Sequence, residues 1–232
     1  ESDVRIMRRT AVFGVYDGGT YGALERVSDH LAEPHHHAPR QRLWRIVAKR
    51  AVLAAGAIER PLVFGNNDRP GIMLAGAVRT YLNRFGVASG SNAIVFVNND
   101  DAASTVSELA AAGVSVSALV DPRPVMSPVV ESLAKKTGIR VISGGSVERA
   151  LGSKSVSGAE IRLQDGSLLT LPCDLIAMSG GWNPSVHLTT HLNGRPVWNS
   201  SIAAFVPGAV PPGMAVAGSA SGALSLADAI TM

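Results

Sequence analysis

Residues 93–142 decide the fold, and their sequence is AIVFVNNDDAASTVSELAAAGVSVSALVDPRPVMSPVVESLAKKTGIRVI. The stretch opens on five consecutive apolar residues, Ala93–Val97, which are typical of a strand buried on both faces of a parallel sheet. Further apolar runs cover residues 114–120 and 139–142, and the segments between the runs carry apolar residues at helical spacing. The stretch therefore predicts strand, helix, strand, helix, strand, which is the order of a parallel sheet with helical crossovers.

The ends of both expected helices are marked in the sequence. The first carries an apolar stripe over residues 102–110 and is followed by a glycine that can end it. Asp100 or Asp101 is expected to cap its N-terminus with a side-chain oxygen. The second helix covers residues 129–137 and is closed by Gly138.

The turn between the first strand and the first helix lacks the glycines that a dinucleotide site requires. In a G-x-G-x-x-G turn, glycines let backbone N–H groups at a helix N-terminus approach a pyrophosphate. Here the turn covers Asn98–Ala103, its first two glycine positions fall near Asn98 and Asp100, and only the small Ala103 conforms. Asp121 stands at the end of the next strand, where an acid would bind a ribose hydroxyl. We interpret the stretch as a nucleotide-binding fold whose phosphate site is degenerate.

Apolar alternation predicts further elements on both sides of this stretch. Three β-runs are expected at residues 4–17, 20–29 and 42–54, and the last of them ends in a short buried parallel strand at 51–54. The other expected elements are a helix at 74–85, an antiparallel meander at 147–151, 159–163 and 168–171 with a turn at Asp165-Gly166, a buried strand at 174–179, a strand and turn at 215–220, and a helix at 224–232.

Composition excludes several classes of protein. Of the 232 residues, 46% are hydrophobic and 17% are charged, which is incompatible with a disordered chain. No uninterrupted apolar stretch approaches about 18 residues, so no membrane span is expected. The single cysteine, Cys173, excludes an internal disulfide and a cysteine-rich metal or redox motif, and a cytoplasmic location is expected. A net charge of +3 with 5% aromatic residues argues against nucleic-acid binding.

Candidate metal and catalytic side chains are few. His35–His37 lie in a proline-bounded loop, and His187 and His191 are four residues apart, but neither set has further ligands nearby in the sequence. Both sets are interpreted as structural. Cys173 is expected to be a buried small apolar residue. The sequence predicts no catalytic residue and no metal site.

Long motifs carry a resemblance to a known family. The first is WRIVAKRAVLAAGAIERPLVF at residues 44–64, which continues as NNDRPGIMLA at 66–75. Two shorter motifs are SGGWNP at 179–184 and AAFVPG at 203–208. With these motifs the chain resembles the α subunit of heterotetrameric sarcosine oxidase over essentially its whole length. The related subunits of hydrogen cyanide synthase and opine oxidase are the nearest alternatives.

The resemblance implies an α/β fold of the two-dinucleotide-binding-domain flavoprotein type, an FAD/NAD(P)-binding Rossmann architecture with small antiparallel meanders. In that scheme residues 1–60 are the later part of the first dinucleotide-binding domain, and 61–92 are a connecting helical segment. Residues 93–182 are an NAD-type domain with a degenerate glycine loop, and 183–232 return to the first domain. Because the chain begins with Glu1 rather than Met and the family's α subunits are much longer, an internal fragment is expected.

The resemblance also implies cofactors and partners for the complete enzyme. Complexes of this family oxidise sarcosine to glycine and reduce oxygen to peroxide, and the one-carbon unit passes to tetrahydrofolate or leaves as formaldehyde. NAD is held by the first domain of the α subunit, FMN lies at the α–β boundary and FAD belongs to the β subunit. The partners are the β, γ and δ subunits. The fragment itself is expected to bind no cofactor and to be inactive.

Two short turns match cofactor-facing turns of the family. AAGA at residues 54–57 matches an A-T-G-A turn, with Ala55 in place of the usual Thr, and AGSA at 217–220 matches a second turn, with Ser219 where many relatives of the fold carry Asp. Simple strand-end packing would explain both turns equally well. The residues that the resemblance assigns to cofactor binding are Ala55, Gly56, Ala57, Gly218, Ser219 and Ala220.

Three hypotheses follow from the sequence. The chain is part of a sarcosine oxidase α subunit, or part of a subunit of a cyanide synthase or opine oxidase that acts as an amine dehydrogenase. Alternatively, it is a non-catalytic nucleotide fold that serves as a scaffold for subunit assembly, a reading that the missing glycines at residues 98–103 support.

Overall fold

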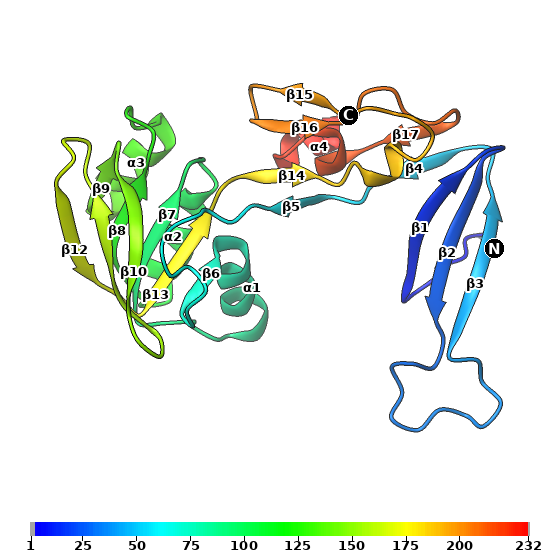
Figure 1. The fold of residues 1–232 in the computed structure, drawn as a ribbon, viewed down its shortest axis with the longest axis horizontal. Coiled ribbons are helices and arrows are strands. Elements are labelled where there is room, and N and C mark those ends of the chain that lie inside the picture. The colour runs from blue at the N-terminus through cyan, green and yellow to red at the C-terminus, as the bar shows by residue number, and fades with distance from the viewer. Residues whose placement is uncertain (1–2, 232) are drawn as a thin grey trace. The chain divides into compact units, whose positions relative to one another are not determined.

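The chain folds into two compact units, which we describe separately (Figure 1). The computed structural model describes residues 3–231, apart from the side chain of Ala102. The central unit comprises residues 59–182, and the split unit comprises the chain up to Ile58 and from Asn183 onward. The chain passes from the split unit to the central unit within β5 (Ala57–Glu59) and returns within β14 (Trp182–Pro184).

A five-stranded parallel sheet forms the middle of the central unit. Its strand order is β6-β13-β7-β8-β9, and all four neighbouring pairs are parallel. The strands are β6 (Ile72–Leu74), β7 (Asn92–Val97), β8 (Ser115–Asp121), β9 (Val141–Ser143) and β13 (Leu175–Ser179). The predicted α/β fold with a parallel sheet is thus confirmed. Residues 61–92, expected to be a connecting helical segment, contain the helix predicted at 74–85 as α1 (Ala75–Phe85) and also contribute a strand of this sheet.

Helices and a meander cover opposite faces of this sheet. On β7, Ala93, Val95 and Val97 pack with α1, α2 (Ala102–Ala111) and α3 (Pro128–Thr137), whereas Ile94 and Phe96 pack toward the meander. The meander consists of β10 (Ser146–Gly152), β11 (Val156–Arg162) and β12 (Leu168–Pro172) in antiparallel order. The period-two alternation of a strand buried on both faces therefore produces a three-layer unit.

The helix ends agree with the sequence patterns in most respects but not in all. Gly138 ends α3 with a φ of 68°, in the left-handed region that glycine adopts without strain. The prediction that a side-chain oxygen of Asp100 or Asp101 caps α2 is wrong. Asp101 occupies the N-cap position of α2, but its side chain makes no capping hydrogen bond. The carboxylate instead contacts the Arg79 guanidinium and the Trp182 indole N–H, which come from other elements.

The split unit combines a meander with a short parallel pair. The strands β1 (Thr10–Tyr16), β2 (Thr20–Arg26) and β3 (Gln41–Val47) are antiparallel, and β4 (Ala51–Leu53) pairs in parallel with β17 (Met214–Val216). The predicted third run thus divides into β3 and β4. The prediction that the strand at 51–54 is buried is wrong, because Val52 is 70% exposed. The remaining elements are η1 (His187–Thr189), β15 (Val197–Asn199), β16 (Ala204–Val206), η2 (Gly218–Ser221) and α4 (Leu226–Thr231).

The core of the split unit is small. It consists of Val15, Tyr21, Leu188 and Met214, with Ile46 and Leu53 among the side chains packed around them. The helix predicted at 224–232 is present as α4, and its expected last residue, Met232, lies outside the described residues.

Candidate functional site

Both predicted cofactor-facing turns lie at one edge of the parallel pair in the split unit. Because β4 and β17 run in the same direction, the turns at residues 54–57 and 217–220 both follow the carboxyl ends of their strands. The Ala217 N–H donates to the Leu53 carbonyl over 3.0 Å, which continues the pairing into the turns. In open α/β sheets, ligands bind outside the carboxyl ends of strands, so the six predicted residues are gathered where the fold places ligands.

Glycine is required in each of these turns. Gly56 has a φ of 72° and Gly218 a φ of 63°, values that side-chain-bearing residues rarely adopt. A Cβ atom built on either glycine would meet no other atom within 4 Å. The space at the Cβ position of each glycine is therefore open.

The other four predicted residues are placed less uniformly. Ala55 is exposed, Ala57 and Ser219 are half-buried, and Ala220 is fully buried. The Ser219 carbonyl accepts from the Gly222 N–H over 3.2 Å, which closes the short helix η2. Ala220 contributes packing beneath the turn, whereas Ala55 presents its small side chain at the surface.

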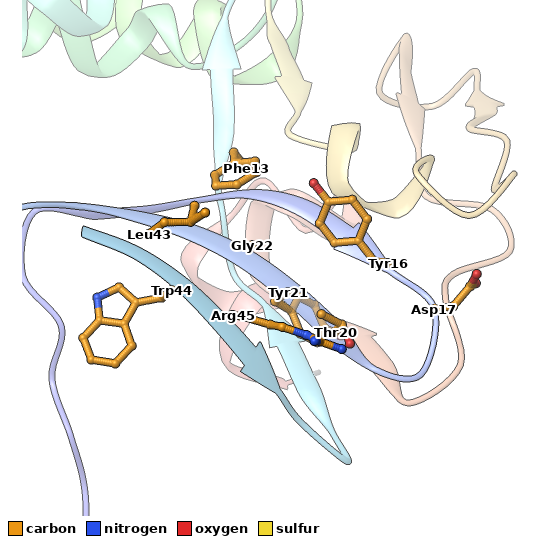
Figure 2. Close-up of a pocket in the computed structure, with 9 residues that line it drawn as sticks. All are labelled: Phe13, Tyr16, Asp17, Thr20, Tyr21, Gly22, Leu43, Trp44 and Arg45. Carbon is orange, nitrogen blue, oxygen red and sulfur yellow. The ribbon is translucent and has the colours of Figure 1, made fainter. Parts of the chain in front are cut away.

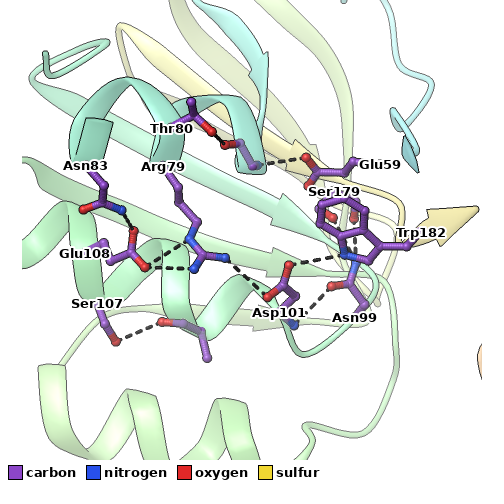
Figure 3. A network of polar contacts seen from close by, with 12 residues as sticks. Glu59, Arg79, Thr80, Asn83, Asn99, Asp101, Ser107, Glu108, Ser179 and Trp182 are labelled. Atoms are coloured by element: carbon purple, nitrogen blue, oxygen red, sulfur yellow. Dashed lines mark hydrogen bonds and ion pairs between the residues drawn. The ribbon is translucent and has the colours of Figure 1, made fainter. Parts of the chain in front are cut away.

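The carboxyl edge of the central sheet carries a polar network rather than a glycine loop (Figure 3). Asp101 forms an ion pair with Arg79 at 3.4 Å and accepts from the indole Nε1 of Trp182 at 3.3 Å. Arg79 also pairs with Glu108 at 2.9 Å, so that α1 and α2 are joined by a carboxylate–guanidinium–carboxylate chain. Asn99 donates to the Ser179 carbonyl over 3.1 Å. The carboxylate of Asp101 thus has two donors within the protein.

Glu59 is a buried carboxylate that the sequence analysis missed. It is 7% exposed, and its Oε2 accepts the Gly76 N–H over 2.8 Å at the first turn of α1. A Cβ atom on Gly76 would lie 2.6 Å from that oxygen, so glycine is needed there. Burial raises the pKa of the Glu59 carboxyl, against hydrogen bonds from the Ser179 hydroxyl and the Gly76 N–H that lower it. No sequence pattern marked Glu59, because it follows an apolar run without a spaced partner.

The raised pKa of Glu59 predicts a pH-dependent stability. The folded chain holds this proton to a higher pH than the unfolded chain, in which a glutamate titrates near about 4.3. The contribution of the protonated carboxyl to stability is therefore fully present below that value and is lost as pH rises through the folded pKa. We expect Glu59→Gln to remove this decline in urea unfolding measured across pH.

A matched control for Glu59 lies on the meander of the central unit. A hydrogen bond from Arg162 lowers the pKa of the half-buried Glu148, so its contribution has the opposite sign and is lost as pH falls. Glu148→Gln should therefore leave the decline on the alkaline side unchanged. An unaltered pH profile in the Glu59→Gln chain would show that the carboxyl is not buried as described.

A second ion-pair group joins the turn after β7 to the end of β8. Arg123 donates from Nε and Nη2 to the carboxylate of Asp121 over 2.7–3.0 Å, and its Nη2 lies 2.7 Å from Asp100. Asp121 is 1% exposed, as expected for a residue at the end of a central strand. The two acids singled out in the sequence are thus brought together by a cation that the sequence analysis did not single out.

Cys173 is buried and 4% exposed. Burial, with the neighbouring charge of Asp174, raises the pKa of the thiol to about 12. We expect iodoacetamide at pH 8 to leave the folded chain essentially unmodified and to label the chain in urea quickly, because the thiolate is the nucleophile. Mass spectrometry of the single cysteine measures both rates, and fast labelling of the folded chain would contradict the burial.

The side-chain contacts of His191, His36 and His37 are structural. His191 accepts the Val15 N–H on its Nδ1 over 3.2 Å and so ties β1 to the segment after β14. His36 and His37 stack edge to face with ring centroids 4.6 Å apart. Within residues 3–231, no group of three or more metal-ligating side chains is close enough to hold an ion.

A hollow of about 460 Å³ lies on the meander of the split unit (Figure 2). Its charged side chains are Asp17 and Arg45, and the rest of its lining is largely apolar or aromatic. Gly22 is essential to its shape, because a Cβ atom there would lie 2.7 Å from the ring of Phe13. The hollow is therefore an open aromatic surface without a cluster of catalytic groups.

No helix among the described residues is long and apolar enough to cross a membrane.

Comparison with known proteins agrees with the resemblance that the sequence motifs carry. No protein-family model matches the chain. A sarcosine oxidase subunit alpha of Rhizobium meliloti (strain 1021) is 45% identical over 225 residues, and one of Corynebacterium sp. (strain U-96) is 42% identical over 233 residues. The chain is similar to sarcosine oxidase α subunits. The alignments cover 97% of this chain, which confirms the resemblance carried by its motifs, and 22% and 24% of these two relatives. The chain thus spans about a quarter of the length of the sarcosine oxidase α subunits that it matches.

Solved structures confirm the fold class. The L-proline dehydrogenase from P. horikoshii is 22% identical with a TM-score of 0.63, covering 91% of this chain and 36% of its own. The thioredoxin reductase of T. acidophilum is 14% identical with a TM-score of 0.65, covering 91% and 66%. An FAD-dependent pyridine nucleotide-disulphide oxidoreductase from Desulfovibrio vulgaris is 15% identical with a TM-score of 0.61, covering 90% and 52%. The similarity to sarcosine oxidase α subunits and the FAD/NAD(P)-binding Rossmann architecture therefore agree.

Proposed function

We propose that this chain is part of the α subunit of a sarcosine oxidase-type flavoprotein oxidoreductase. The observation that carries the proposal is the 40–45% identity to three sarcosine oxidase α subunits over 97% of the chain. The complete enzyme would oxidise sarcosine to glycine, form peroxide and transfer the one-carbon unit to tetrahydrofolate. Its location would be cytoplasmic, and its partners would be β, γ and δ subunits.

The strand-end turns of the split unit are the proposed cofactor contact. In this proposal the split unit is the later part of the first dinucleotide-binding domain, and Gly56 and Gly218 face an NAD bound to the α subunit. Their left-handed backbone and the open space before them support this placement. A bound nicotinamide cofactor would supply hydride chemistry. FAD and FMN would belong to other parts of the complex.

The proposal is tested on the complete parent protein, purified with the subunits that accompany it. We expect peroxide formation with sarcosine, together with additional subunits in the purified complex. Cyanide formation from glycine, or turnover of an opine without turnover of sarcosine, would instead support the related cyanide synthase or opine oxidase function. A parent protein without a glycine-rich dinucleotide motif before this segment and a folate-binding region after it would contradict the sarcosine oxidase assignment.

The 232-residue chain alone is expected to be inactive. The split unit contains only two parallel strands at its proposed cofactor edge, so the strand–helix turn that would hold the pyrophosphate is not supplied by the described residues. We expect no peroxide from sarcosine and no FAD absorbance after gel filtration of the reconstituted chain. The parent complex serves as the positive control, and peroxide production by the chain alone would contradict the expectation.

A scaffold role is the second candidate function for this segment. The specific observation that favours it is the ion-paired edge of the central unit, where Asp100 and Asp101 are both engaged by cations. If the segment only scaffolds, breaking these ion pairs should weaken subunit assembly, and substitutions of Gly56 and Gly218 should not change cofactor content. Loss of cofactor with intact assembly would exclude this role.

A further inference from the structure

The central unit has its own carboxyl edge, at which proteins with this fold bind a dinucleotide. In a Rossmann unit the adenosine half lies over the carboxyl ends of the first two strands, with an acid after the second strand binding the ribose and a glycine turn before the first helix holding the pyrophosphate. Here those places are the end of β8, at Asp121, and the turn from β7 into α2. Whether a dinucleotide fits depends on what these groups already bind.

The ribose-binding position is already filled. Both carboxylate oxygens of Asp121 accept hydrogen bonds from the Arg123 guanidinium, and Oδ1 also accepts the Arg123 N–H over 2.9 Å. These donors come from the direction of the chain that follows β8, and Asp121 is 1% exposed. A ribose could therefore hydrogen-bond to Asp121 only by displacing this guanidinium.

The phosphate-binding position is filled as well. Arg123 extends beyond Asp121 to Asp100 in the turn before α2, with Nη2 2.7 Å from the Asp100 carboxylate. The next residue, Asp101, is held by Arg79 and Trp182. Two carboxylates thus stand at the helix start, each neutralised by a protein cation, where a glycine turn would present bare N–H groups to phosphate oxygens.

We propose that Arg123 is an internal substitute for the adenosine half of a dinucleotide, so that the central unit holds no nucleotide. Its guanidinium donates to Asp121 where ribose hydroxyls would donate, and it bridges to the turn where the pyrophosphate would lie. The fold leads one to expect a dinucleotide here, but the residues present do not fit one. The ion pairs of Arg123 occupy the positions that the dinucleotide would take. This inference does not depend on the proposed function, because it concerns only residues of the central unit.

Hydrogen exchange followed by mass spectrometry tests the inference on the full 232-residue chain. We expect millimolar NADH or NADPH to leave exchange unchanged in peptides covering residues 98–104 and 119–124. Slower exchange in those two peptides would overturn the inference. Protection confined to peptides around 54–57 and 217–220 would support it, and would separately support the proposed cofactor contact in the split unit.

Thermal melting of single variants provides a second, independent test. Arg123→Ala leaves the buried Asp121 carboxylate without its donors, so we expect the melting temperature to fall by about 5–15 °C. Arg140→Ala, which removes an exposed arginine of the same unit, should shift it by no more than about 2 °C. Equal melting temperatures for the two variants would overturn the inference. If Arg123→Ala does not fold, Arg123→Lys should fold and melt at a lower temperature than the wild type. Lysine keeps the positive charge but cannot donate two parallel hydrogen bonds to the Asp121 carboxylate.

Discussion

Gly218→Val in the complete parent protein is expected to weaken dinucleotide binding at least about tenfold, which corresponds to about 1.4 kcal/mol. Gly218 lies at the carboxyl end of β17 with a φ of 63°, and a Cβ atom there would project into the open space before the two turns. If that space receives the cofactor, a branched side chain occupies room that the cofactor needs. Fluorescence titration with NADH measures the dissociation constant.

The control for this variant must introduce the same backbone strain at a glycine that lies away from the proposed cofactor contact. Gly138 ends α3 with a φ of 68°, and a Cβ atom there also meets nothing within 4 Å. Gly138→Val should therefore cost a similar amount of stability, but it should leave the NADH dissociation constant unchanged. If either valine variant fails to fold, the corresponding alanine pair repeats the comparison with less strain. Equal affinities for the two variants would remove Gly218 from the cofactor contact.

Ile176→Ala is expected to lower the free energy of unfolding by about 2–5 kcal/mol. Ile176 is fully buried on β13, between β6 and β7, and it packs with Ile94 and Ile161 from both sides of the interface with the meander. Truncation removes apolar contacts and leaves a cavity that flanking strands on both sides cannot collapse to fill. Urea unfolding monitored by circular dichroism gives the difference in free energy.

Leu168 offers the matched control for that substitution. It begins β12 in the same unit and is 55% exposed. Leu168→Ala should change the free energy of unfolding by less than about 0.5 kcal/mol. A small loss for Ile176→Ala, comparable with the control, would contradict the full burial of Ile176 on β13.

The local elements of the central unit were predictable because each depends on nearby residues. The apolar run at 93–97 became β7, the run at 174–179 became β13, and the helix predicted at 129–137 became α3. Helix ends at glycine and the hairpin turn at Asp165-Gly166 follow from backbone conformations that glycine alone adopts easily. Gly166 has a φ of 85°, in agreement with that turn.

The polar groups of the candidate site could not be predicted, because their partners are far apart in the chain. Arg79 meets Asp101 across 22 residues, and Glu59 meets Gly76 across 17. From neighbouring residues alone, Asp101 was predicted to cap α2. In the structure its carboxylate binds a guanidinium from α1 and the indole of Trp182 instead. Asp101 has helical backbone angles, φ −63° and ψ −22°, whereas a capping residue is normally extended, so its carboxylate is directed to these distant partners.

The cofactor-facing turns were predictable in part, less well than the local elements and better than the polar contacts. Their small residues were recognised through a resemblance, and the parallel pairing of β4 with β17 brings them to one edge. The exposure of Val52 could not be foreseen, because an apolar strand sequence does not state how many neighbours the strand will find.

The short parallel pair also determines how this chain should behave in the laboratory. Among the described residues, β4 and β17 pair only with each other, so each strand leaves a row of backbone N–H and C=O groups unmatched by a further strand. Parallel strands are normally enclosed in larger sheets, and open strand edges recruit other strands. We therefore expect the chain to aggregate through these edges when it is expressed alone. A co-expressed polypeptide that adds a strand beside β4 or β17 is expected to reduce this aggregation.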